Sequence, residues 1–177
     1  MIALYTDRLK IRTLIKEDWD SFNRLHQHPD VIQYICEPMT ELAIKQKFNS
    51  RLAPWEFDSG EWLTLVIEDV HTGAFIGFTG FCCDDALLRR AEVGYIIAPE
   101  VSGRGYATES LNAVIDWGIH QFSIHKYIGI CSTQNIASAK VMTACGFINE
   151  GCLRQNYKIG SHWHDEFTFG LLARDIR

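Results

Sequence analysis

The sequence has little positive charge: 17 lysines and arginines stand against 22 aspartates and glutamates, a formal net charge of −5. Proteins that bind nucleic acids neutralise phosphates with clustered lysine and arginine side chains. Because no such excess is present, we expect neither DNA nor RNA as a partner. A mildly acidic surface is compatible with a cationic, amine-bearing substrate, but it only biases the encounter.

The sequence also lacks a long hydrophobic run. Its first residues, MIALYTDRLKIRTL, carry an acidic and a basic side chain at positions 7 and 8. This pattern fits neither a secretory signal peptide nor a membrane anchor. We therefore expect a cytoplasmic protein without a membrane partner.

Proline is scarce, with 4 residues against 13 glycines, and no linker, repeat or low-complexity segment divides the chain. Hydrophobic residues make up 47% and charged residues 22% of the sequence, which is the composition of a globular protein. A chain of this length buries roughly 70% of the surface that its unfolded form exposes, so it can hold a core without disulfides. We expect a single domain over residues 1–177.

Cysteine spacing gives no sign of a disulfide framework or a metal site. The six cysteines are irregularly spaced and form no Cys-x-x-Cys pair. The pairs His26/His28 and His162/His164 have no cysteine or carboxylate at a spacing typical of zinc sites. We expect free thiols and no metal ion.

Hydrophobic periodicity indicates a mixture of strands and helices. Alternation predicts a strand over 9–14, and helical spacing predicts a helix over 18–26 that ends before Pro29. Thr40 is expected to cap a second helix that ends before Pro54. Further strands are predicted over 62–68, 74–82, 91–98, 126–131, 147–154 and 166–172, and further helices over the stripe 111–122 and over 136–145. This order predicts an α/β (α+β) domain.

The most informative segment is the turn 101–108, VSGRGYAT, between a predicted strand and a predicted helix. Two glycines allow the backbone to bend so that its amides converge, and the helix that follows adds unpaired N–H groups and a positive dipole end. Arg104 adds a fixed positive charge. The turn is therefore a candidate pyrophosphate site.

Other interpretations of this turn compete. It is not a P-loop, because no GxxxxGK[ST] motif occurs. It is not a dinucleotide fingerprint, because Thr108 stands at the third glycine position and no acid closes the strand 126–131. A glycine turn that merely starts a helix stays open as the alternative.

Seven short segments, spread in order over nearly the whole chain, form a recognisable set. They are Thr6-Asp7-Arg8-Leu9 with Ile11-Arg12; Glu92-Val93-Gly94-Tyr95; Gly103-Arg104-Gly105-Tyr106-Ala107-Thr108-Glu109; Asn135-x-x-Ser138; Gly146-Phe147 followed by Glu150-Gly151; Leu153-Arg154; and Gly160-x-x-Trp163-x-Asp165. Together they resemble the GNAT N-acetyltransferase family, and within it the branch of ribosomal-protein N-terminal acetyltransferases.

The resemblance implies a single domain whose mixed, mostly antiparallel central sheet is splayed at its middle and flanked by helices. It implies transfer of the acetyl group of acetyl-CoA to a primary amine by direct attack in a ternary complex. A backbone N–H near Ile96 and Ile97 would face the carbonyl oxygen, and pantetheine would lie along this strand. The implied cofactor-binding residues are Ile96, Ile97, Ala98, Gly103, Arg104, Gly105, Tyr106, Ala107, Thr108, Asn135 and Ser138.

Ser138 is the candidate that assists the departing thiolate. In many relatives a tyrosine four residues before the Gly-Phe pair has this role, and here Met142 stands in that place. The alternative is that Asn135 caps a helix and Ser138 bonds within its first turn; the two interpretations are compatible.

Glu92 is the candidate base, because it is the one acid on an otherwise apolar strand. Its alternative is a surface ion pair with Arg89 or Arg90. Relatives in the ribosomal-protein branch often carry an acid at the position of Tyr157, and this departure bears on the substrate.

The implied acceptor is a protein N-terminus, such as that of a ribosomal protein, and the implied assembly is a monomer or a homodimer. Acetylation of a small amine, either a polyamine or an aminoglycoside, is an alternative with the same mechanism. The absence of the usual tyrosine also leaves open a catalytically silent acyl-CoA-binding regulatory module. Three aromatic residues, Trp55, Phe57 and Trp62, either wall the substrate slot or pack in the core.

Overall fold

The computed structural model describes residues 1–176, and Arg177, where the predicted domain ends, lies outside the described residues. Eight strands form one sheet in the order β1-β2-β3-β4-β5-β6-β8-β7. The strands are β1 (Ala3–Tyr5), β2 (Leu9–Thr13), β3 (Trp62–Asp69), β4 (Phe75–Asp85), β5 (Arg90–Ile97), β6 (Lys126–Ser132), β7 (Ile148–Ile159) and β8 (His162–Leu172). The α-helices are α1 (Trp19–Gln27), α2 (Pro29–Ile32), α3 (Glu41–Leu52), α4 (Tyr106–Phe122) and α5 (Ile136–Ala144). The predicted α+β class is confirmed.

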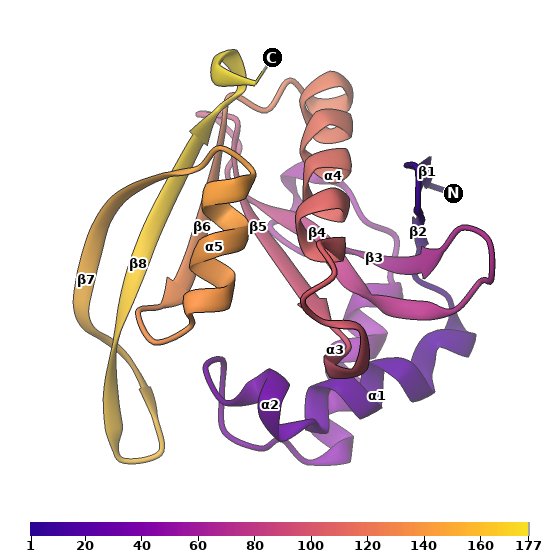
Figure 1. The fold of residues 1–177 in the computed structure, drawn as a ribbon, viewed down its shortest axis with the longest axis horizontal. Helices are drawn as coiled ribbons and strands as arrows, with labels where there is room; N and C mark the ends of the chain where they lie inside the picture. Colours follow the sequence, from indigo (N-terminus) through magenta and orange to yellow (C-terminus); the bar gives the residue numbers. More distant parts are fainter. Residues whose placement is uncertain (177) are drawn as a thin grey trace.

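The sheet is splayed between β5 and β6, its one parallel pair among the described strands. These two strands pair only at Arg90–Lys126, Ala91–Tyr127 and Glu92–Ile128. Beyond Glu92 the strand β5 continues to Ile97 without a partner on that side. Figure 1 shows the two strands diverging toward the bottom of the view. The predicted splay at the middle of the sheet is therefore confirmed.

Helices cover both faces of the sheet, and side-chain alternation along β5 assigns each face its own core. Val93 packs in the cluster that holds Leu111 and Val114 of α4. Ile96 packs against the cluster that holds Phe22 of α1 and Phe48 of α3. Successive residues of a strand point to opposite faces, so α4 and α5 lie on one face and α1 and α3 on the other.

The helix ends follow the expected capping chemistry. Thr40 is the N-cap of α3, and its hydroxyl accepts a hydrogen bond of 3.2 Å from the backbone N–H of Ala43. Pro29 ends the first predicted helix but also begins α2, a helix of 4 residues that the periodicity did not indicate.

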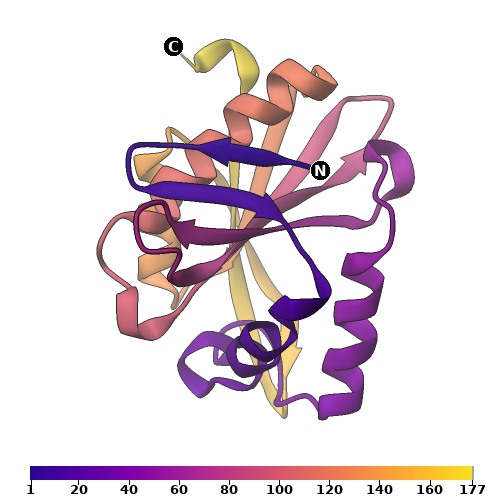
Figure 2. The same ribbon diagram turned by 90° about the vertical axis from the view of Figure 1, so that its right-hand side faces the viewer.

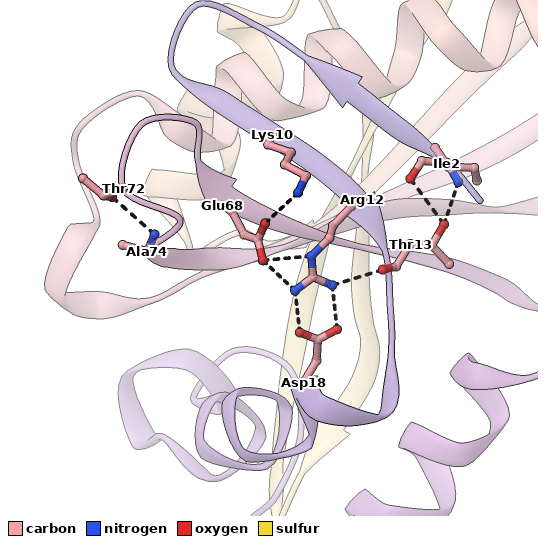
Figure 3. Close-up of polar contacts among 8 residues, drawn as sticks. All are labelled: Ile2, Lys10, Arg12, Thr13, Asp18, Glu68, Thr72 and Ala74. Atoms are coloured by element: carbon pink, nitrogen blue, oxygen red, sulfur yellow. Dashed lines mark hydrogen bonds and ion pairs between the residues drawn. The ribbon is translucent and has the colours of Figure 1, made fainter.

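A charged network ties α1 to the sheet (Figure 3). The guanidinium of Arg12 on β2 donates to both carboxylate oxygens of Asp18, at 2.7 and 2.8 Å, and to Glu68 on β3. Asp18 is the N-cap residue of α1 and also accepts from the backbone N–H of Ile15, at 2.8 Å. Arg12 thereby sets where α1 begins relative to the sheet.

The sheet is larger at both edges than the sequence predicts. Figures 1 and 2 place β1 at one edge and β7 at the other. The last two predicted strands are longer than expected: the first extends to Ile159 and the second begins at His162, so together they form a long hairpin. Nearly all of β7 is exposed, and without a buried face it shows no hydrophobic period.

All six cysteines are free. Within residues 1–176, no group of three or more His, Cys, Asp or Glu side chains lies where it could hold a metal ion. No helix of the described part of the chain is long and apolar enough to cross a membrane.

Candidate active site

The glycine turn lies between the end of β5 and the start of α4. Gly103 has φ of +77° and Gly105 φ of +82°, both in the left-handed region that favours glycine. Gly105 is also the N-cap residue of α4, a helix of 17 residues. The first amides of a long helix therefore follow the turn directly, which is the arrangement of an anion site at a helix N-terminus.

The N-terminal segment holds this turn in place, a role that the sequence did not reveal. Thr6 donates to Glu109 of α4 at 2.6 Å, and Arg8 pairs with the same carboxylate at 2.6 Å. Arg8 also donates to the backbone carbonyl of Arg104 at 3.0 Å, and its guanidinium lies 4.7 Å from the centroid of the Tyr106 ring. Through these contacts the Thr-Asp-Arg-Leu segment and Glu109 together fix the position of the glycine turn.

The backbone of β5 is directed into the splay at alternate residues. The N–H of Ala98 donates to Ile76 of β4 at 2.8 Å, so the N–H of Ile96, two residues earlier, is also on the β4 side. The N–H of Ile97 then faces the gap toward β6. Of the two predicted residues, Ile97 is therefore the one whose N–H is directed into the gap. Ala98, also predicted, is fully buried and has its N–H engaged.

A cavity of about 280 Å³ joins the splay to the glycine turn. Its lining includes Ile96, Ile97, Ser102, Ala107, Asn135 and Ser138. Five of the predicted cofactor residues thus share one space. Three further predicted residues are exposed beside this cavity: Gly103, Arg104 and Gly105. The backbone carbonyl of Thr108 accepts a hydrogen bond from the Cys145 thiol at 3.6 Å.

Ser138 lies at the start of α5 and faces β5. Its backbone N–H donates to the Asn135 side chain at 3.0 Å, which confirms that Asn135 caps the helix. Its hydroxyl lies 2.8 Å from the hydroxyl of Tyr95, a partner that the sequence did not indicate. The Tyr95 hydroxyl also lies 3.1 Å from the Ser138 backbone carbonyl, to which it can donate instead. The serine hydrogen is free to point into the cavity when Tyr95 donates to the serine hydroxyl. Met142 is buried and fills the space beside Gly129 that a side chain there would take, and its thioether has no hydrogen to donate, so it offers no substitute for the missing tyrosine.

Glu92 lines a second cavity of about 290 Å³, together with Glu166 and Ser138. Burial raises the pKa of Glu92, and Asp84 and Glu166 add to the increase. The ion pair considered for Glu92 does not form: Arg90 pairs with Asp84, and Arg89 pairs with Asp58. A desolvated carboxylate without a cationic partner is suited to accept a proton from an ammonium.

The aromatic residues divide between the site and the core. Trp55 and Phe57 pack against Phe122, with ring centroids 5.5 and 5.2 Å away, so they belong to the core. Tyr157 lines the cavity of Glu92 and donates to the backbone carbonyl of Tyr34 at 3.2 Å, which ties the β7–β8 hairpin to the segment after α2.

Comparisons with known proteins agree with this geometry. The family model of the acetyltransferase (GNAT) domain matches residues 8–148. The chain is 27% identical over 173 residues to the uncharacterized N-acetyltransferase YnaD of Bacillus subtilis, covering 96% of each chain. It is 26% identical over 106 residues to the putative ribosomal N-acetyltransferase YdaF of Bacillus subtilis, covering 60% of this chain and 58% of YdaF. The crystal structure of spermidine N-acetyltransferase from Vibrio cholerae in complex with CoA and spermine superposes with a TM-score of 0.83 at 23% identity, covering 96% of this chain and 98% of that one.

Proposed function

The chain belongs to the GNAT family of acetyl-CoA-dependent N-acetyltransferases, and on that premise we propose that residues 1–177 form one domain that acetylates a primary α-amine by direct attack in a ternary complex. The observation that carries this proposal is the cavity of about 280 Å³ that joins the splay to the glycine turn. It offers backbone amides at one end and the hydroxyl of Ser138 at the other.

The residues of this cavity suit acetyl-CoA, the substrate that brings the reactive thioester. The amides of the turn 103–108 and the charge of Arg104 would hold its pyrophosphate. The N–H groups of alternate β5 residues face the splay, which suits pantetheine lying along the strand as an added strand does.

The proton chemistry then falls to two side chains. Glu92 would accept the proton of the substrate ammonium, directly or through water. The N–H of Ile97 would face the acetyl oxygen, where negative charge develops. Ser138, supported by Tyr95, would donate to the sulfur as the thiolate leaves, since a thiol with a pKa of about 8.5 is a modest leaving group.

The proposed acceptor is the α-amine at a protein N-terminus, as the sequence motifs of the ribosomal-protein branch suggest. The likeness to YdaF supports this choice. A polyamine is the second candidate. Both place an ammonium in the cavity of Glu92 and Glu166, whose described lining contains two carboxylates and no basic side chain.

Thermal unfolding with acetyl-CoA tests the proposal first. A ligand at 100 times its Kd adds about 2.7 kcal/mol to the free energy of unfolding, so the Tm should rise. Gly105→Val places a β-branched residue at a positive φ and should abolish the rise. An unchanged Tm for the wild-type chain at saturating acetyl-CoA refutes the proposal. A fall in thioester absorbance when the chain is mixed with acetyl-CoA and any amine shows turnover, and so refutes the alternative of a catalytically silent acyl-CoA-binding module.

A further inference from the structure

A third cavity lies between α1, α3 and the sheet, and its charge is opposite to that of the Glu92 cavity. It has a volume of about 220 Å³ and is lined by His26 of α1 and by Lys47 and Arg51 of α3. No aspartate or glutamate is among the described residues that line it. We refer to it as the basic cavity.

The two cations of the basic cavity have no anionic partner. Neither Lys47 nor Arg51 forms an ion pair with any residue of the range 1–176. The Nη1 atom of Arg51 is buried and has no hydrogen-bond partner there. Burial lowers the pKa of both side chains, and the exposed Glu61 offsets this only in part for Arg51. A buried donor left without an acceptor costs stability, and an anionic ligand would remove that cost.

His26 adds a third group in the same place, which becomes a donor to a ligand when its ring is protonated. Its Nδ1 contacts the backbone carbonyl of Phe22 at 2.8 Å, which leaves Nε2 for a ligand. Burial, Lys47 and Arg51 lower the pKa of His26 to about 4, so an anion between these three groups would favour its protonated form.

The basic cavity is adjacent to the proposed reaction site. Ile35, Gly94 and Tyr95 line both it and the cavity of Glu92. Gly94 lies opposite Gly80 on β4, and the ring of Trp62 packs directly over Gly94, where any larger side chain would collide with it. Because both cavities share the three residues named above, one small molecule can extend from one cavity to the other beside the Trp62 ring.

We propose that the basic cavity binds a carboxylate that the acceptor carries close to the amine to be acetylated. The proposal rests on the proposed function, because it assumes that the amine lies near Glu92. The ammonium would then face two carboxylates, and the acceptor carboxylate would face Lys47 and Arg51. Most of the remaining walls are apolar and include Phe22, Trp62, Phe78 and Ile96, so they fit the apolar part of an acceptor that carries both charges.

Two sources supply this chemistry: a free amino acid with an apolar side chain, and a peptide with an acidic residue at its N-terminus. A polyamine fits poorly, because its second ammonium would meet Lys47 or Arg51. The basic cavity thus separates the two acceptor classes that the Glu92 cavity accommodates equally.

The test compares acceptors that differ only in the carboxylate, using the wild-type full chain and acetyl-CoA. The pairs are L-phenylalanine and its amide, and peptides that begin with Glu and with Gln, with spermidine alongside. We expect kcat/KM for one carboxylate form to exceed that of its neutral partner at least tenfold. Preference for the free amino acid or for the Glu peptide identifies the source, and either supports the proposal.

Variants then localise the preference. Arg51→Gln and Lys47→Gln should each raise KM for the carboxylate acceptor about tenfold and leave KM for the neutral acceptor unchanged. Lys45→Gln is the matched control, because Lys45 lies on the same helix but stacks on Trp19, with Nζ 3.9 Å from the ring centroid. Its KM values should equal those of the wild-type chain.

The carboxylate proposal is overturned if kcat/KM is equal for the two members of both pairs, or if spermidine is preferred. The wild-type chain alone is enough for this test. The rise in Tm with acetyl-CoA distinguishes failure of the carboxylate proposal from failure of the proposed function. If the acceptors show no carboxylate preference but the Tm rises, only the carboxylate proposal fails. If the Tm does not rise, the proposed function fails as well.

Discussion

Glu92 is held in a position that favours its chemistry at the expense of stability. Burial raises the pKa of Glu92, so the folded chain binds its proton more tightly than the unfolded chain does. Between the ordinary glutamate pKa of about 4.3 and the raised value, stability therefore falls as pH rises. At neutral pH the folded chain carries a half-buried carboxylate without an ion pair.

Glu92→Gln should therefore separate activity from stability. We expect kcat/KM to fall at least about 100-fold, since general base catalysis typically contributes at least that factor. The Tm at pH 8 should rise relative to the wild-type chain, and the difference should vanish near pH 4. Differential scanning fluorimetry across pH measures the second effect. The exposed Glu56→Gln is the control; full activity of the Glu92 variant would remove Glu92 from the mechanism.

Single residues were predictable where a short motif contains them, and their partners were not. Ser138 and Asn135 follow from the Asn-x-x-Ser spacing, and the capping bond within it confirms the local geometry. Tyr95 is separated from Ser138 by 43 positions, and their contact depends on how α5 packs on β5. The basic cavity is of the same kind, because it brings His26 and Arg51 together only through the packing of α1 and α3.

At the scale of elements, burial decided what could be predicted. The buried runs of β3, β4 and β5 have clear hydrophobic patterns, and these strands lie where we expected them. The 3-residue β1 was not predicted, and β7 was predicted only as far as residue 154. Pairing with a neighbouring strand rather than burial defines β1 and the rest of β7, so they lack such a pattern.

The contact between the segment that precedes β2 and α4 has a testable role in acetyl-CoA binding. Arg8→Met removes the pair with Glu109 and the bond to the Arg104 carbonyl, so the turn loses its support. We expect the Kd for acetyl-CoA to rise about tenfold, a cost of about 1.4 kcal/mol. Isothermal titration calorimetry measures it.

Arg24→Met is the matched control for this variant. Arg24 pairs with Glu100 at the same distance of 2.6 Å, but both side chains are about half exposed, at 49% and 53%. Exposed pairs contribute about 0–1 kcal/mol, so Kd should not change. Equal Kd values for the two variants would contradict the supporting role of Arg8.

At the scale of the whole molecule, the Arg12 network joins the sheet to the helices that enclose the basic cavity. The side chain of Arg12 is 19% exposed and that of Asp18 9%. The hydrogen bonds that Arg12 donates to Asp18 and, to a smaller extent, to Glu68 raise the pKa of Arg12. Arg12→Met leaves two carboxylates without their partner and should lower stability by about 3 kcal/mol. For a chain of this size, that corresponds to a Tm lower by about 10 °C.

The same variant should affect one substrate more than the other. Because Asp18 begins α1, a shift of α1 moves His26 and should raise KM for the acceptor. The turn at the start of α4 has no contact with Arg12, so the Kd for acetyl-CoA should stay the same. If Arg12→Met raised the Kd for acetyl-CoA more than KM for the acceptor, the Arg12 network would support the acetyl-CoA site and not the acceptor site.

His26 should govern how the whole chain responds to acid. Burial, Lys47 and Arg51 lower the pKa of His26 to about 4, whereas an unfolded histidine has a pKa of about 6.5. The unfolded chain therefore takes up a proton first, and stability present above pH 6.5 is lost as the pH falls toward 4. The loss is on the order of 3 kcal/mol.

His26→Asn should remove this part of the acid dependence, because asparagine keeps a donor for the Phe22 carbonyl but does not titrate. Urea denaturation gives the free energy of unfolding at pH 7 and at pH 5, and the measured quantity is the difference between them. Packing that the variant loses lowers both values equally and cancels in this difference. His120 makes the same contact with the carbonyl four residues earlier, at 2.7 Å, but on the exposed side of α4. His120→Asn should therefore leave the difference unchanged. A His26→Asn variant as acid-sensitive as the wild-type chain would show that the folded chain does not lower the pKa of His26.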